Sequence, residues 1–203
     1  MVSSTIIENI DSMRKSGLAS LGFFYFDFRE DEKRDLRGLL SSVLVQLCHQ
    51  SDSYFRILST FYSEHANGSR HPSSDALMKC LKDILEVPGQ APVYLIVDGL
   101  DECSNSSDMP SPREKVLMLL EELIKLQFPN LRICVTSRPE VDIKVALEPL
   151  TFYSLSLHEE DGQIEDIENY IRSVVSADPK MRRWKAADRE LVIDVLMKKS
   201  DGM

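Results

Sequence analysis

Three acidic side chains directly follow an apolar run, an arrangement that suits the binding of a divalent cation. The run Val93–Val97 leads into Asp98, and Asp101 and Glu102 come soon after. An unbroken apolar run of this kind is typical of a strand that is buried on both faces. A carboxylate at the end of such a strand can hold Mg2+, usually through water, because Mg2+ takes octahedral oxygen ligands. Asp101 and Glu102 would then orient a water molecule or add further metal contacts.

A second apolar run ends in a cation. Leu131–Val135 is followed by Thr136, Ser137 and Arg138. In open α/β sheets ligands bind beyond the carboxyl ends of the strands, so a guanidinium here could reach a γ-phosphate whose oxygens match its fork. A polar loop and a surface arginine would explain either motif taken alone. The two strand ends together, separated by one predicted helix, favour a nucleotide site.

The elements that must position these residues follow from the apolar periodicity. Helical spacing predicts a short helix after Pro139 and longer helices over 3–15, 35–50, 53–65, 73–87, 113–127, 161–176 and 186–199. Apolar or alternating runs predict strands over 21–28, 93–100, 131–138 and 152–157. This alternation predicts an α/β fold whose parallel sheet is covered by helices on both faces. Because the strands stop after about residue 158, we expect a core domain over 1–158 and the start of a helical extension over 159–203.

Composition limits the classes of partner. The formal net charge is −9 and the pI is about 5.0, which argues against binding of nucleic acid or an anionic membrane, since phosphate surfaces select basic faces. The sequence has no apolar signal core at its start and no apolar run that could span a membrane, so we expect a cytoplasmic protein without a membrane partner. The four cysteines form no CxxC pair and are expected to be buried thiols: Cys48, Cys80, Cys103 and Cys134.

The two strand-end motifs resemble those of the NACHT class of STAND P-loop NTPases, and in particular of fungal proteins with a nephrocystin-type NACHT domain. The motifs are "VYLIVDGLDEC" (93–103) and "LRICVTSRPE" (131–140), with a helix between them. Two further segments are similar to that family: "LGFFYFDFREDEKRDLRGLLSSVLVQLCHQ" (21–50) and "YSLSLHEEDGQIEDIENYI" (153–171). The resemblance extends from about residue 2 to the end of the sequence.

The resemblance implies a role for each site residue. Asp98 would coordinate Mg2+, Asp101 and Glu102 would contribute to hydrolysis, and Arg138 would act as a sensor-like arginine on the bound nucleotide. It further implies a signalling switch in which ADP holds a closed state and ATP permits homotypic NACHT contacts. Many fungal members of this class serve nonself recognition and regulated cell death, a form of innate immunity.

The phosphate-binding loop of that class has no counterpart in this sequence. The class requires GxxxxGK followed by Ser or Thr, whose amides and lysine hold the phosphates. Gly17 and Gly22 have the right separation, but Phe23 and Phe24 stand where the lysine and the hydroxyl are needed, so we reject this segment. Because "MVSSTIIENI" (1–10) resembles the helix that follows the loop, we expect the sequence to begin inside its parent domain. The end of the sequence, "LMKKSDGM" (196–203), resembles a helix beyond which the family usually continues.

The expected fold is therefore a partial P-loop NTPase, a three-layer parallel sheet that lacks its first, central strand and its phosphate loop. The family's strand order predicts 21–28, 93–100 and 131–138 as neighbours in that sequence, with 152–157 facing a gap or moving in beside 131–138. An exposed apolar edge would make the chain marginally stable.

The expected function is that of a fragment of a NACHT signalling NTPase. Mg2+ and ATP or ADP are the ligands that the resemblance implies, yet without the loop we expect this chain to show little nucleotide binding or hydrolysis. Two alternatives remain open at this point. The chain could be a non-enzymatic module that pairs with NACHT proteins, or an incomplete gene model of an active ATPase whose upstream sequence encodes the loop.

Overall fold

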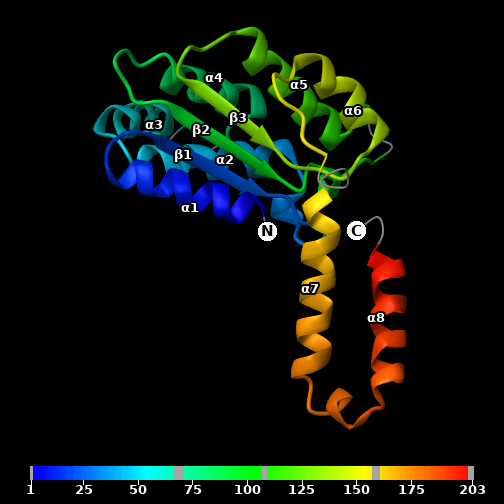
Figure 1. Ribbon diagram of the computed structural model, residues 1–203. Helices are drawn as coiled ribbons and strands as arrows, with labels where there is room; N and C mark the ends of the chain where they lie inside the picture. Colours follow the sequence, from blue (N-terminus) through cyan, green and yellow to red (C-terminus); the bar gives the residue numbers. More distant parts are fainter. Residues whose placement is uncertain (1, 66–70, 107–108, 157–160, 201–203) are drawn as a thin grey trace. The chain divides into compact units, whose positions relative to one another are not determined.

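A computed structural model describes residues 2–65, 71–106, 109–156 and 161–200. The chain divides into two units, residues 1–151 and residues 152–203. All four predicted site residues belong to the first unit, whose elements are drawn from blue to yellow-green in Figure 1.

The first unit is built around a three-stranded parallel sheet in the order β1-β2-β3. The strands are β1 (Ser20–Tyr25), β2 (Val93–Asp98) and β3 (Leu131–Val135). Ser20 pairs with Val93, and Val93 pairs with Leu131. The α/β class, the parallel sheet and the order of these three strands are confirmed. Each strand ends before its predicted limit, at Tyr25, Asp98 and Val135.

Helices fill the intervals between the strands, as the periodicity predicted. The first unit contains α1 (Val2–Lys15), α2 (Leu36–Cys48), α3 (Asp52–Glu64), α4 (Ser74–Leu85), α5 (Pro112–Lys125) and α6 (Val141–Leu147). Their starts are encoded locally. Ser73 caps α4 through a bond from the amide of Ala76, and Ser111 forms a capping box with Glu114 at the start of α5.

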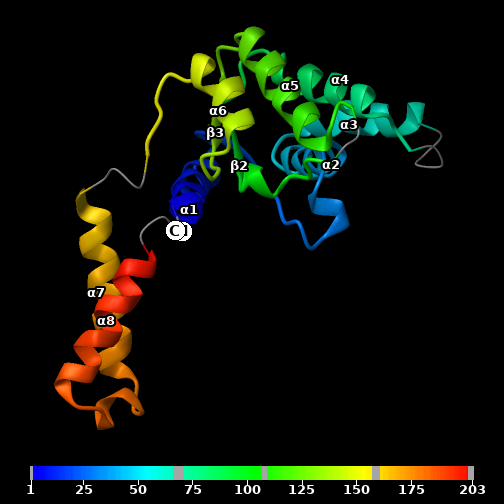
Figure 2. The same cartoon turned by 90° about the vertical axis from the view of Figure 1, so that its right-hand side faces the viewer.

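Helices cover both faces of the sheet (Figures 1 and 2). On one face, Ile10 of α1 is buried in a small cluster with Leu21 and Ile96. The other face carries the main core, which α2, α4 and α5 supply with leucines such as Leu44 and Leu120. A sheet covered in this way buries the sides of its strands and leaves their carboxyl ends free to form a site.

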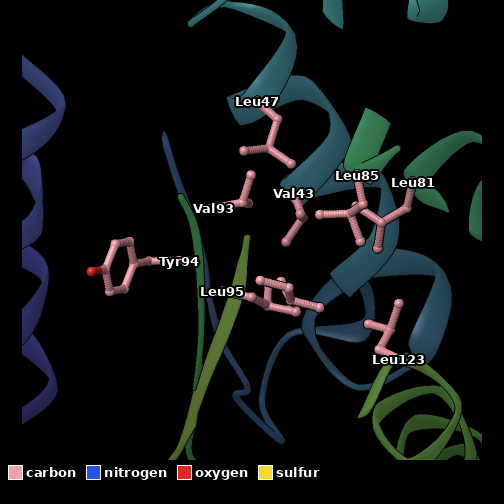
Figure 3. Close-up of a pocket in the computed structure, with 10 residues that line it drawn as sticks. Val43, Leu47, Leu81, Leu85, Val93, Tyr94, Leu95 and Leu123 are labelled. Atoms are coloured by element: carbon pink, nitrogen blue, oxygen red, sulfur yellow. The ribbon is translucent and has the colours of Figure 1, made fainter. Parts of the chain in front are cut away.

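Two hollows among the described residues of the first unit lie away from those carboxyl ends. Between the sheet and α2, α4 and α5 is an apolar gap of about 10 Å³, and Figure 3 shows Val93 and Val43 facing it while Tyr94 points to the opposite side of the sheet. A gap of this size holds at most one water and offers it no polar partner. A wider open hollow of about 590 Å³ is lined by residues of α3 and α4, from Arg56 to Asp83, and by none from the sheet.

The outer edge of β1 is closed by the side chains of Gln46, in α2, and of Gln50, just after the end of α2. Gln50 accepts a hydrogen bond from the Leu21 amide at 2.9 Å and donates one to the Leu21 carbonyl at 2.6 Å. Gln46 does the same for Phe23, at 3.0 Å and 2.8 Å. The close approach of α2 depends on Gly22, because a Cβ there would lie 3.0 Å from Cγ1 of Val43. The two glutamines thus occupy the hydrogen-bonding groups that a neighbouring strand would use.

The outer edge of β3 is not closed in this way. The carbonyl of Asn130 and the amide of Thr136 bond to β2, so by the alternation of a strand the amides and carbonyls of Ile133 and Val135 face outward. Within the described part of the chain these outward groups have no hydrogen-bond partner. β3 therefore presents an open edge.

The strand predicted over 152–157 is wrong for the residues that the structure describes there. Residues 152–156 form no strand and are exposed, with Phe152 and Tyr153 each 96% accessible; residue 157 lies outside the described residues. Alternating side chains gave the local signal of a strand, but a strand also needs a partner edge, which this segment does not find.

The second unit is a helical hairpin of α7 (Asp161–Ala177) and α8 (Ala186–Ser200). Val175 and Ile193 are its buried apolar residues. Arg172 joins the helices through an ion pair with Glu190 at 3.0 Å. In neither unit does a described helix combine the length and the apolar character that crossing a membrane requires.

Candidate functional site

The carboxylate of Asp98 lies at the carboxyl end of β2, where the side chain of Thr136 holds it. The Thr136 hydroxyl donates to Oδ1 of Asp98 at 2.6 Å and accepts from the Gly99 amide at 3.1 Å. The Thr136 carbonyl accepts from the Leu100 amide at 3.0 Å. These bonds fasten the end of β2 to the residue after β3, so the two strand-end motifs do meet, as their parallel order requires.

The next residues form a tight turn that we call the acid turn, Gly99–Cys103. Gly99 adopts a left-handed conformation with φ of 68°, which favours glycine, and a short 3-10 helix follows over Leu100–Glu102. Leu100 is fully buried and anchors the turn in the core. Asp101 and Glu102 are therefore held at the surface of the sheet's carboxyl edge while remaining only partly exposed.

Asp101 contacts the predicted sensor residue directly. Its Oδ1 accepts a hydrogen bond from the Arg138 amide at 3.0 Å, and its Oδ2 lies 3.5 Å from Nε of Arg138. The Arg138 side chain is 81% exposed, so the ion pair adds little stability. The amide bond to a carboxylate is of the stronger, charge-assisted kind, and it fixes where the segment after β3 leaves the sheet.

The end of β1 adds two residues that the sequence analysis missed. Asp27 accepts from the Arg29 amide and from Nε of Arg29, both at 2.9 Å, and from Nη2 at 2.7 Å. These bonds from Arg29 lower the pKa of Asp27 to about 2. The signal was present in the sequence, because an acid and a cation follow the apolar run of β1 just as they follow β2 and β3.

The charge of Glu102 acts on Arg29, on the β1 side of the site. The pKa of Arg29 is raised mainly by its hydrogen bonds to Asp27, then by the charge of Asp27, and further by the charge of Glu102. The two acids of the turn are thus divided, with Asp101 bound to the segment after β3 and Glu102 near the cation after β1.

The donor set at Asp98 fits a magnesium ion. One carboxylate, with the Thr136 hydroxyl beside it and water for the remaining positions, matches an ion that is commonly held by one or two carboxylates and phosphate oxygens. Among the described residues no group of three or more His, Cys, Asp or Glu side chains could enclose a metal. The fit is therefore to a water-rich cation and not to a structural metal cage.

The glycine pair with the spacing of a phosphate loop is not directly followed by a helix. Gly17 lies between α1 and β1, and Gly22 lies within β1, packed against Val43. Neither begins a helix, so the rejection of this pair as a phosphate loop is confirmed.

The cysteine thiols take no part in the site. Cys103 is buried and donates to the Arg34 carbonyl at 3.2 Å, and burial raises its pKa to about 12. Burial likewise raises the pKa of Cys80 to about 11. Cys48 is also buried, Cys134 is half-buried, and all four are unbridged. A thiol with such a raised pKa is a poor nucleophile.

Comparison with known proteins gives one positive result. The model of the protein family described as "Nephrocystin 3, N-terminal" matches residues 1–138. This range contains β1, β2, β3 and all four predicted site residues. Searches of curated proteins and of solved structures gave no significant match.

Proposed function

The chain belongs to the nephrocystin 3 N-terminal family, and we propose that it carries the magnesium-binding residues of a NACHT-type P-loop NTPase of the STAND class, a nucleotide-dependent signalling switch. Asp98 would hold Mg2+, which would neutralise the charge of the nucleotide's phosphates. Asp101 and Glu102 would orient the attacking water, and Arg138 would bind the γ-phosphate. The domain would cover residues 1–158, with a helical extension from 159 to 203.

The observation that carries this proposal is the meeting of Asp98, Thr136, Asp101 and Arg138 at one edge of a parallel sheet. Thr136 joins the ends of β2 and β3, and Asp101 joins the acid turn to Arg138. An acid from one strand and a cation from its parallel neighbour are the groups that a magnesium-nucleotide site needs.

The open edge of β3 supports the P-loop relationship. In the NACHT class the strand that carries the phosphate loop would lie beside β3, and β3 has free outward groups at Ile133 and Val135 among the described residues. A strand placed there would bring its following loop next to Asp98 and Arg138. We therefore propose that this chain alone binds nucleotide weakly and that a strand added beside β3 would complete the site.

The open edge also supports a second function, that of a non-enzymatic module. A strand from a longer member of the family could pair with β3 by strand addition. Light scattering of this chain mixed with such a member, purified and carrying its own phosphate loop, tests this function. A stable one-to-one complex would support it, and independent elution of the two proteins would exclude it.

The primary test measures cation and nucleotide binding separately. We expect Mn2+, used as a paramagnetic probe for Mg2+, to broaden the NMR signals of Asp98 and Thr136, and we expect the substitution Asp98→Asn to abolish this effect. Asp27→Asn is the matched control, since it removes a carboxylate from the same sheet edge outside the cation site. Broadening that survives in Asp98→Asn would contradict the assignment.

Calorimetric titration with magnesium-ATP tests the nucleotide half of the proposal. We expect no binding with a Kd below about 1 mM, which corresponds to roughly 4 kcal/mol of binding free energy. Submillimolar binding would show that the chain does not need an added strand. A chain extended upstream to include a GxxxxGK loop is expected to bind at least about tenfold more tightly.

A further inference from the structure

Arg113 is a buried cation that the site description has not yet used. It lies in the first turn of α5 and is only 8% exposed. Burial of a charged group is costly unless the group is paired and its donors are satisfied. The contacts of Arg113 therefore show what its burial provides.

The guanidinium of Arg113 holds the acid turn from inside. Nη2 donates to the Asp101 carbonyl at 2.5 Å, and Nε donates to the Cys103 carbonyl at 3.2 Å. The Arg113 amide donates to the Ser104 carbonyl at 3.0 Å. One residue thus fixes the backbone at the middle, at the end and just beyond the end of the turn.

The third donor of the same guanidinium reaches the segment that follows β3. Nη1 of Arg113 lies 3.2 Å from Oδ2 of Asp142, in the first turn of α6. Arg138, four residues earlier, is held by the carboxylate of Asp101. The segment 138–142 is therefore tied to the acid turn at both ends, once through the Asp101 side chain and once through Arg113.

We propose that Arg113 is a positioning residue that sets the place of Asp101 relative to Arg138. This inference rests on the proposed function of that site, because the position matters only if the pair acts on a ligand. Arg113 fixes the backbone of Asp101, and Asp101 fixes the amide of Arg138, so a shift of the first is passed to the second. The planar fork is essential, since a lysine has the charge but cannot direct three donors to two carbonyls and a carboxylate.

The test is amide hydrogen exchange, measured by NMR, in Arg113→Lys. The Arg138 amide reports the bond to Asp101, while the amide of Val97, at the fully buried centre of the sheet, reports the stability of the whole unit. We expect exchange at Arg138 to accelerate about tenfold, as for the loss of one hydrogen bond, with exchange at Val97 unchanged. Equal acceleration at both amides, or none at either, would overturn the proposal and leave Arg113 a general stabiliser.

A second variant keeps the proposal testable if Arg113→Lys does not fold. Asp142→Asn keeps both carbonyl bonds of Arg113 and removes only the ion pair to α6. We expect about threefold faster exchange at Arg138, again without a change at Val97. An unchanged Arg138 amide in this variant would overturn the coupling through α6.

Mn2+ broadening at Asp98 separates this inference from the function on which it rests. If the wild-type chain shows broadening, we expect it to persist in Arg113→Lys, because Thr136 and not Arg113 holds the Asp98 carboxylate. If the wild-type chain shows none, the proposed cation site fails, while the exchange rates still decide whether Arg113 positions Arg138. Loss of broadening in Arg113→Lys with normal exchange at Arg138 would contradict the assigned path through Asp101.

Discussion

The two outer edges of the sheet differ in whether their outward peptide groups are hydrogen-bonded. At β1, the outward peptide groups of Leu21 and Phe23 are fully bonded by Gln50 and Gln46. At β3, the outward groups of Ile133 and Val135 have no partner among the described residues. Proteins ordinarily protect strand edges against unwanted pairing. Among the described residues the sheet therefore has one protected edge, at β1, and one open edge, at β3.

Both glutamines can bond to β1 because the spacing of their positions matches the spacing of Leu21 and Phe23 along the strand. Gln46 lies in the last turn of α2 and Gln50 follows four residues later, just beyond the end of the helix. Four residues at helical rise span about 6 Å, while Leu21 and Phe23 are separated by about 6.6 Å along β1. The helix runs antiparallel to the strand, so the later glutamine meets the earlier strand residue. A side-chain amide offers one donor and one acceptor, the same pair that a neighbouring strand would present.

The largest expected effect comes from opening the closed edge with Gln46→Leu and Gln50→Leu together. The four hydrogen bonds to β1 are lost, together with one to the Ser42 hydroxyl and one to the Gln46 carbonyl. We therefore expect the free energy of unfolding to fall by about 3 kcal/mol, as measured by urea denaturation. With both edges open, the variant should also self-associate in analytical ultracentrifugation. A double variant as stable and as monomeric as the wild-type chain would refute the closure.

A smaller effect is expected from moving α2 away from β1 with Gly22→Ala. The added Cβ would lie 3.0 Å from Cγ1 of Val43, and overpacking of this kind typically costs about 1–2 kcal/mol. The second substitution Val43→Ala should recover part of the loss, which a double-mutant cycle would measure. Strictly additive effects of the two substitutions would show that α2 does not depend on Gly22 for its approach.

The smallest expected effect concerns thiol access at the two edges. Cys134 lies on β3 and is half-buried, whereas Cys48 at the end of α2 is buried; burial raises the pKa of both thiols. Local opening should be more frequent at the open edge, so we expect Cys134 to react with a thiol reagent about tenfold faster than Cys48. Mass spectrometry of partly labelled protein gives the two rates, and a faster Cys48 would reverse the comparison.

The main elements of the first unit could be predicted because their signals are local. Continuous apolar runs marked β2 and β3, helical spacing marked the helices, and Asp98, Asp101 and Arg138 stood directly at the strand ends. The segment 152–157 failed because alternation cannot show whether a partner strand is present. The order of β1, β2 and β3 required the family resemblance as well.

The features that the sequence did not indicate depend on contacts between distant residues. Gln46 and Gln50 look like the solvent side of an amphipathic helix, and only the fold shows that they face a strand edge. Arg113 looks like an exposed charge in a first helical turn, and its burial depends on carbonyls of the acid turn and on Asp142. Asp27 and Arg29 were the exception, because their position after β1 repeats the pattern that identified the site.

Hydrogen exchange at the two edges tests the central claim most directly, since the proposed completion of the site depends on β3 being the open edge. The account predicts that the amides of Leu21 and Phe23 exchange slowly in the native protein, although β1 is an edge strand. The amides of Ile133 and Val135 should exchange at least about a hundredfold faster. Equal protection at both edges would contradict the account, because it would mean that the edge of β3 is already occupied.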